Sequence, residues 1–150
     1  MKTLAIGDLK ARIPIIQGGM GVGISLSGLA SAVANEGGIG VISAAGLGLL
    51  YKKLSPSNYT EAGNLGLVEE IRKAREKAKG IIGVNVMVAL SDFAELVKTS
   101  IAEKVDIIFS GAGLPLDLPS FLKKDSVTKL VPIVSSARAV RIICEKWKNN

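Results

Sequence analysis

Residues 14–21 read Pro-Ile-Ile-Gln-Gly-Gly-Met-Gly, a short apolar run that ends directly in glycines. Such a run predicts a buried β-strand, and glycines at its end let the backbone approach a flat ligand closely and present its N–H groups. A tight turn that requires positive φ angles is the structural alternative. No complete G-x-G-x-x-G with strand–turn–helix spacing and no P-loop pattern occurs, so neither of those nucleotide sites is supported.

The rest of the chain alternates apolar runs with helical patterns. Five runs are typical of strands buried on both faces: residues 13–17, 39–43, 81–87, 106–110 and 130–135. Helical patterns follow them at residues 27–36, 66–79, 91–104, 119–124 and 136–148. The helix boundaries carry suitable residues, with serines as N-caps and glycines at the exits: Ser27, Ser91, Ser136, Gly37 and Gly80. The sequence therefore predicts an α/β fold in which a βα unit repeats five times.

One connection is longer than the others. Residues 46–65 follow the second predicted strand and have the composition of a surface loop, which is either a lid over an active site or a plain excursion. Closing a (β/α)₈ barrel takes about 250 residues, so five units fall short. The chain is then a piece of a barrel, an open five-stranded sheet of another α/β type, or a half-barrel that a second chain completes.

Charge and composition exclude several classes of partner. The net charge is +6, but the basic residues alternate with glutamates on the predicted helices, and aromatic residues make up only 4%. Solvated helix faces look like this, so no nucleic-acid partner is expected. Residues 13–35 lack charges but are interrupted by Pro14 and glycines, so no membrane span is expected, and nothing at residues 1–12 marks the chain for export. A cytoplasmic location is the expectation.

Cys144 is the only cysteine, which excludes an intramolecular disulfide and any multi-cysteine metal site, and we expect no metal. Its segment is amphipathic, which predicts that Cys144 packs on the apolar helix face as a small hydrophobe.

Five motifs follow one another in an order that resembles a known family. They are Pro-Ile-Ile-Gln-Gly-Gly-Met at 14–20, Gly-Gly-Ile-Gly-Val-Ile-Ser-Ala-Ala-Gly at 37–46, Gly-Val-Asn-Val-Met at 83–87, Ser-Gly-Ala-Gly-Leu-Pro at 110–115 and Val-Pro-Ile-Val-Ser-Ser-Ala-Arg-Ala at 131–139. Together they resemble the nitronate monooxygenase (2-nitropropane dioxygenase) family, whose close relative is the flavin-dependent enoyl-acyl-carrier-protein reductase. The resemblance implies a TIM barrel that holds FMN at the carboxyl ends of its strands, with residues 1–150 forming about the first five βα units and the rest of the barrel missing from this chain.

The resemblance also implies which residues contact the flavin. Gly18, Gly19 and Met20 would line its ring, and Asn85 would hydrogen-bond its polar edge. Further candidates end the second and fourth strands: Ser43, Ala44, Ser110, Gly111, Ala112 and Gly113. The structural alternatives are a buried amide that satisfies a loop for Asn85 and ordinary core packing for Met20.

The activity that the resemblance implies is oxidation of an alkyl nitronate by O₂ to a carbonyl compound and nitrite. An enoyl-thioester reductase is the enzymatic alternative, and a non-catalytic half-barrel that associates with itself or with a complementing C-terminal half is the third hypothesis. The family's histidine has no counterpart, since the chain contains no histidine, so the catalytic residues stay unknown. The flavin phosphate is held on late strands in this family. We therefore expect residues 1–150 alone to bind FMN weakly or not at all.

Overall fold

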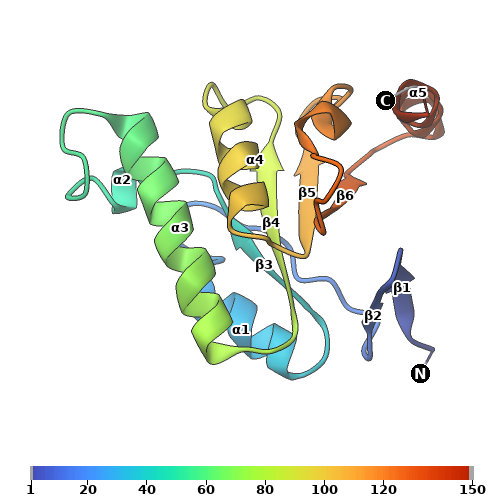
Figure 1. The fold of residues 1–150 in the computed structure, drawn as a ribbon, viewed down its shortest axis with the longest axis horizontal. Coiled ribbons are helices and arrows are strands. Elements are labelled where there is room, and N and C mark those ends of the chain that lie inside the picture. The colour runs from blue at the N-terminus through green and yellow to red at the C-terminus, as the bar shows by residue number, and fades with distance from the viewer. Residues whose placement is uncertain (1, 149–150) are drawn as a thin grey trace.

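The computed structural model describes residues 2–148, which are organised around a four-stranded parallel sheet of order β3-β4-β5-β6 (Figure 1). The strands are β3 (Ile39–Ser43), β4 (Ile81–Met87), β5 (Ile107–Gly111) and β6 (Lys129–Pro132). The helices are α1 (Ser27–Asn35), α2 (Leu47–Leu50), α3 (Tyr59–Lys77), α4 (Phe93–Ala102), the 3₁₀ turn η1 (Leu118–Phe121) and α5 (Ala137–Trp147). Strands and helices alternate as predicted, which confirms the parallel α/β fold.

The predicted first strand, residues 13–17, is reduced to a single parallel bridge between Ile16 and Ile39. Beyond this bridge, the side chain of Gln17 continues the pairing with β3. Gln17 Nε2 donates to Val41 O (2.9 Å), and Val41 N donates to Gln17 Oε1 (3.1 Å). This amide takes the two bonds that a continuing backbone would make to β3. The segment therefore lies beside β3 as the next member of the sheet, and the glycines begin where it leaves.

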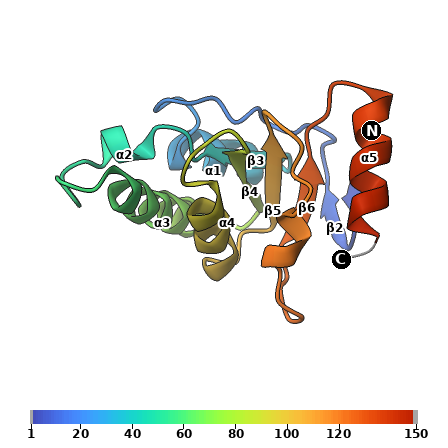
Figure 2. The same cartoon turned by 90° about the horizontal axis from the view of Figure 1, so that it is seen from above.

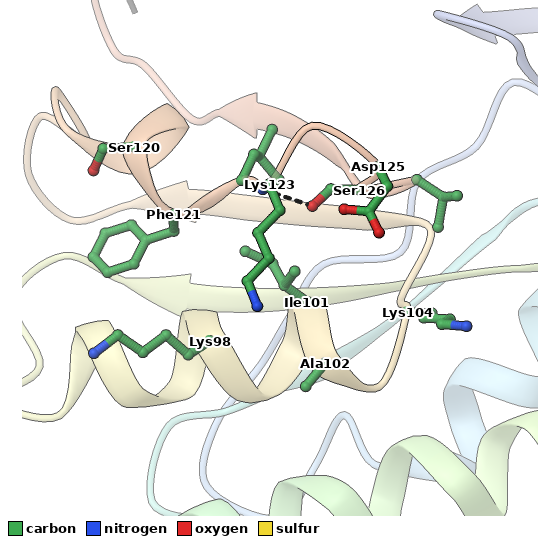
Figure 3. Close-up of a pocket in the computed structure, with 11 residues that line it drawn as sticks. Lys98, Ile101, Ala102, Lys104, Ser120, Phe121, Lys123, Asp125 and Ser126 are labelled. Carbon is green, nitrogen blue, oxygen red and sulfur yellow. Dashed lines mark hydrogen bonds between the residues drawn. The ribbon is translucent and has the colours of Figure 1, made fainter.

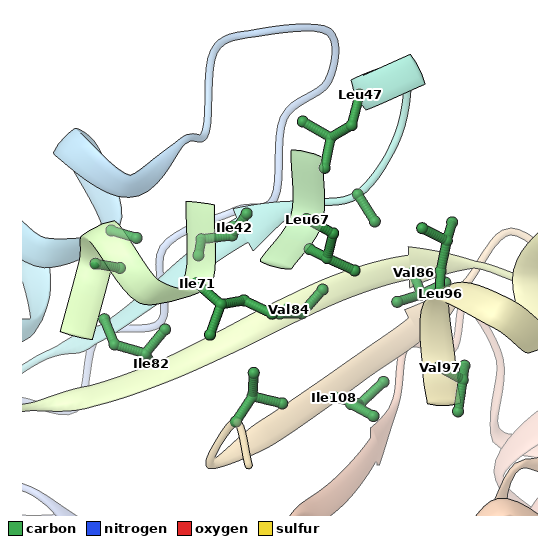
Figure 4. Packing of buried hydrophobic residues seen from close by; sticks show 14 of the residues in the cluster. Ile42, Leu47, Leu67, Ile71, Ile82, Val84, Val86, Leu96, Val97 and Ile108 are labelled. Carbon is green, nitrogen blue, oxygen red and sulfur yellow. The ribbon is translucent and has the colours of Figure 1, made fainter. Parts of the chain in front are cut away.

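The core consists of two clusters on opposite faces of the sheet, because successive strand residues point to opposite sides. The larger cluster joins the strands to α1, α3 and α4, which cover one face, as Figure 2 shows from above. Figure 4 shows Ile42 and Val84 from the strands beside Leu67 and Ile71 of α3. Each of these side chains is almost completely buried.

A hairpin that the sequence patterns did not predict covers the other face near the amino ends of the strands. It consists of β1 (Leu4–Ile6) and β2 (Leu9–Ala11), paired antiparallel, and it packs on Ile39, Val41 and Phe109. An ion pair of 2.6 Å between Asp8 Oδ1 and Lys129 Nζ attaches its turn to β6. The hairpin closes this end of the sheet and leaves the carboxyl ends of the strands for a site.

The stretch 46–65 is not a plain surface loop, so that alternative is wrong, whereas a lid stays a prediction. It contains α2 and the beginning of α3, whose N-cap Asn58 accepts a hydrogen bond from Glu61 N (3.0 Å). The glycines in this stretch weaken the helical pattern of the sequence. Packing requires glycine at position 66, because a Cβ there would lie 2.5 Å from Tyr51 Cδ2. The helix predicted at 66–79 therefore begins at Tyr59.

Several finer predictions can be checked at the helix ends. Ser136 is a true N-cap and accepts from Ala139 N (3.2 Å), whereas α1 and α4 begin after Leu26 and Asp92, so Ser27 and Ser91 are not N-caps. The helix predicted at 119–124 is only the turn η1.

The last helix also corrects an expectation. Only Ile143 of α5 is fully buried, and Cys144 is exposed, because α5 touches the rest of the chain along a narrow stripe. In the part of the chain that the structure describes, no helix is long and apolar enough to cross a membrane.

Candidate functional site

Two polar side chains lie next to each other where β3 and β4 end. Ser43 and Asn85 are register partners in the parallel pairing, and Asn85 is paired in turn with Phe109 on β5. Paired residues of parallel strands point to the same face, so Ser43 and Asn85 share the face opposite the helices. The neighbouring residues on this face are apolar, which makes the pair a small polar spot on an apolar surface.

The glycine-rich loop lies directly over this pair. A Cβ on Gly19 would come within 2.4 Å of Asn85 Cβ, and one on Gly21 would come within 3.3 Å of Ser43 Oγ. In this loop only Gly23 has a positive φ, of 77°. Close approach to the strand ends, rather than a turn requirement, therefore explains the glycines at 19 and 21.

Ser25, which is not among the candidate residues predicted from the sequence, holds the loop in place. Its Oγ donates to Gly18 O (3.0 Å) and accepts from Met20 N (2.9 Å), while its backbone O accepts from Ser43 N (2.8 Å). The residue is 1% exposed. A serine between a glycine loop and a helix is the only signal that marks it in the sequence.

The polar atoms of the site are not fully satisfied. Asn85 Nδ2 donates to Gly19 O (3.2 Å), but Asn85 Oδ1 and Ser43 Oγ are buried with no hydrogen-bond partner among the described residues. Burying an acceptor without a partner costs about 1–3 kcal/mol. The alternative role for Asn85, a buried amide that satisfies a loop, therefore accounts for Nδ2 but leaves Oδ1 without a partner. Two acceptor oxygens beneath a glycine cradle fit a flat ring that carries N–H donors at its edge, as a flavin does.

The structure places the other candidates in different positions. Ala44 is buried in the helix-side cluster, and Ser110 is the register partner of Val86, whose side chain also faces the helices. Ser110 Oγ is a third buried oxygen that has no hydrogen-bond partner within residues 2–148. Met20 is 62% exposed, so it is not a core residue.

The remaining candidates end β5 or follow it. Gly111 is packed against Ile133, since a Cβ there would lie 2.9 Å from Ile133 Cβ. Ala112 and Gly113 are exposed and have φ angles of 55° and 144°. The structure brings Gly19, Ser43 and Asn85 together, and the roles of the others stay predictions.

A buried carboxylate on α3 supports the start of α1, although the charged residues around it in the sequence predict a solvated helix face. Glu70 of α3 is 3% exposed; its Oε2 accepts from Ser27 N (2.5 Å) at the start of α1, and its Oε1 accepts from Tyr51 Oη. Lys73 Nζ lies 3.9 Å from Oε1. Glu70 therefore caps α1 from another helix and joins three segments.

The titration behaviour of this cluster follows from its burial and hydrogen bonds. Burial, followed by the hydrogen bond to Glu70, raises the pKa of Tyr51 to about 12. Burial pushes the pKa of Glu70 up, but the hydrogen bonds from Tyr51 and Ser27 outweigh it and leave that pKa below its usual value. At neutral pH Glu70 is thus ionised and Tyr51 is neutral.

Comparison with solved structures shows similar chains over most of this one. FabK from Thermotoga maritima matches with a TM-score of 0.68 and 28% identity, covering 89% of this chain and 37% of its own. A single-residue mutant of that protein matches with a TM-score of 0.71 and 31% identity, covering 89% and 40%. The nitroalkane oxidase from Streptomyces ansochromogenes shares the fold at 16% identity, with a TM-score of 0.71 and coverage of 91% and 44%.

These matches and the family comparison agree. This chain spans about two-fifths of the length of the similar structures. A sequence comparison with curated proteins gave no match. The model of the family described as nitronate monooxygenase matches residues 2–150, and the chain therefore belongs to the nitronate monooxygenase family.

Proposed function

We propose that this chain supplies the ring-contacting part of an FMN site in an oxidoreductase that oxidises alkyl nitronates with O₂ to a carbonyl compound and nitrite. The observation that carries the proposal is the pair of unpartnered buried oxygens, Ser43 Oγ and Asn85 Oδ1, beneath the glycine loop. FMN, when bound, supplies the redox chemistry itself. The chain's own residues accept hydrogen bonds, fix the ring's orientation and keep water away from one of its faces.

The contacts within the site indicate what each side chain would do. Asn85 holds Gly19 with its nitrogen and keeps its oxygen for the ligand, so one side chain sets both the loop and the ring position. The side chains of Gln17 and Ser25 position the two ends of the loop, because each donates a hydrogen bond to a backbone oxygen. No residue of this chain is assigned to proton transfer, and the anchor for the flavin phosphate is likewise unassigned.

Asn85→Leu is expected to weaken FMN binding about tenfold or more, because the change replaces a buried acceptor with an apolar group of similar size. Fluorescence quenching of FMN on titration with the purified protein measures it. Asn35→Leu is the matched control: Asn35 is exposed at the end of α1, where Nδ2 donates to Lys77 O (2.9 Å), and its replacement should leave flavin affinity unchanged. Equal affinities for Asn85→Leu and the unaltered protein would contradict the site.

Ser43→Ala gives a second readout that does not depend on how leucine packs at position 85. It should weaken FMN binding severalfold without lowering the melting temperature, because it removes a buried hydroxyl that has no partner in the fold. A fall in both quantities would assign Ser43 to the fold instead of the ligand.

The second candidate is a flavin-dependent enoyl-acyl-carrier-protein reductase. What favours it is the higher identity to FabK, 28–31%, than to the nitroalkane oxidase, 16%. Nitrite release from an alkyl nitronate supports the first candidate. Oxidation of NADH or NADPH that depends on a crotonyl thioester supports the second.

A non-catalytic half-barrel is the third candidate, and the edges of the sheet favour it. Ile15 and Ile16 are 57% and 43% exposed beside β3, and Ile133 is 52% exposed beyond β6. Exposed apolar residues beside open edge strands favour association with a second copy or a complementing C-terminal half. A colourless, well-folded oligomer that gains no stability from FMN would favour this candidate over both enzymes.

A further inference from the structure

The connection between β5 and β6 differs from the others in the sheet. The segments before β3, β4 and β5 contain helices of 9, 19 and 10 residues, whereas η1 has only 4. A full helix would cover the outer face here. In its place, a hollow of about 790 Å³ lies between α4 and residues 120–123 and 125–127 (Figure 3). This volume falls within the range of small-molecule sites, about 300–1,000 Å³.

The inner wall of the hollow is apolar and rigid. Ile101 of α4 and Phe121 of η1 both line it, and both also pack against the main core. Phe121 makes an edge-to-face contact with Phe93, with ring centroids 6.3 Å apart and an interplanar angle of 83°. Such a contact stabilises Phe121 in this orientation, so the apolar wall is present without a ligand.

The rim carries an excess of positive charge. Three lysines line the hollow against one carboxylate, Asp125. Among the described residues, Lys98 forms one ion pair, in which its Nζ lies 3.6 Å from Oε1 of the exposed Glu95. Exposed ion pairs of this kind contribute little to stability. Within residues 2–148, neither Lys104 nor Lys123 forms an ion pair. In Figure 3 the side chain of Lys123 extends across the hollow toward α4, beside Ile101.

From this combination we propose that the hollow binds a small amphiphilic anion, an alkyl or aryl body with a carboxylate or phosphate head. The body would lie on Ile101 and Phe121, and the head would contact the ammonium groups of Lys123 and Lys98. The site is on the helix side of the sheet, whereas Ser43 and Asn85 face the other side. It is therefore independent of the proposed flavin site, and either can fail without the other.

The test is a calorimetric titration of the purified protein with decanoate and, separately, with decyl phosphate, which decides between the two heads. Decyltrimethylammonium carries the same chain with the opposite charge, and acetate carries the head alone. Decanoate or decyl phosphate should bind, and both controls should bind at least about tenfold more weakly, because neither supplies both contacts. Equal binding of decyltrimethylammonium would overturn the proposal.

Two neighbouring lysines provide a matched pair of variants. Lys123→Glu should weaken binding about tenfold or more, whereas Lys124→Glu, which makes the same charge change at a residue that does not line the hollow, should change it less than about twofold. Both residues are exposed, so both variants should fold. Equal effects would show general charge attraction and overturn the site. Binding of an acidic amphipathic peptide without binding of either decyl anion would also overturn it, in favour of a protein-docking groove.

Discussion

Gly40→Ala is expected to lower the free energy of unfolding by about 3 kcal/mol or more, enough to unfold much of a marginal protein. A Cβ at this position in β3 would lie only 1.8 Å from the backbone oxygen of Ala30 in α1. The clash is with backbone, so no side-chain rotation relieves it, and α1 must move away from the sheet. Because the loop over Ser43 leads into α1, the site would be disturbed as well. Urea denaturation measures the effect.

Gly28→Ala is the control for Gly40→Ala. Gly28 lies in α1 itself, and a Cβ there meets no atom within 4 Å. Alanine is the better helix former, so this variant should keep its stability or gain up to about 1 kcal/mol. Similar losses for the two variants would mean that α1 does not pack on β3 as described.

Glu70→Ala is expected to lower the free energy of unfolding by about 2–3 kcal/mol, because it leaves the buried N–H of Ser27 and the half-buried hydroxyl of Tyr51 without their acceptor. Glu70→Gln keeps the shape and one acceptor oxygen, so it should cost about 1 kcal/mol. The matched surface change is Glu76→Ala on the exposed side of α3, which should lie within about 0.5 kcal/mol of the unaltered protein. Equal costs at positions 70 and 76 would contradict the buried role.

The same cluster predicts how stability depends on pH. The pKa of Glu70 is lower in the folded protein than in the unfolded chain, where it is about 4.5. The contribution of Glu70 to the free energy of unfolding is therefore complete above pH 4.5 and is lost as the pH falls through the folded pKa. The pKa of Tyr51 is raised from 10.0 to about 12. The contribution of Tyr51 to the free energy of unfolding is therefore complete below pH 10 and is lost as the pH rises toward 12. Glu70→Ala should remove part of both dependences. An unchanged pH profile in that variant would assign them to other groups.

The apolar runs predicted the sheet because β3, β4 and β5 are buried on both faces, and only continuous apolar residues satisfy that position. The hairpin escaped prediction because its strands are three residues long and half-exposed. The sequence pattern does not predict the start of α3, because Gly63 and Gly66 lower helix propensity. Packing against Tyr51 nevertheless requires glycine at position 66.

Within the site, the meeting of Gly19 with Asn85 was predictable, since the carboxyl ends of parallel strands share one edge. The roles of Glu70 and Ser25, which support the site, were not predictable from the sequence. Glu70 stands beside Glu69 and Lys73 in a charged stretch, and nothing local distinguishes the buried carboxylate from its exposed neighbours. Its position between Leu67, Ile71 and Ala74 on the buried stripe of α3 becomes visible only when the helix register is known. Ser25 depends in the same way on a contact with the far end of β3.

The most direct test of the proposed flavin site is a nuclear magnetic resonance titration of the protein with FMN up to millimolar concentration, following the backbone amides and the Asn85 side-chain amide. The site predicts that the largest shifts fall on Gly19, Ser43 and Asn85 and that Asn85→Leu reduces them strongly. Riboflavin, which lacks the phosphate, should shift the same resonances, because the contacts are with the ring. Shifts that fall on other surfaces and on none of these three residues would contradict it.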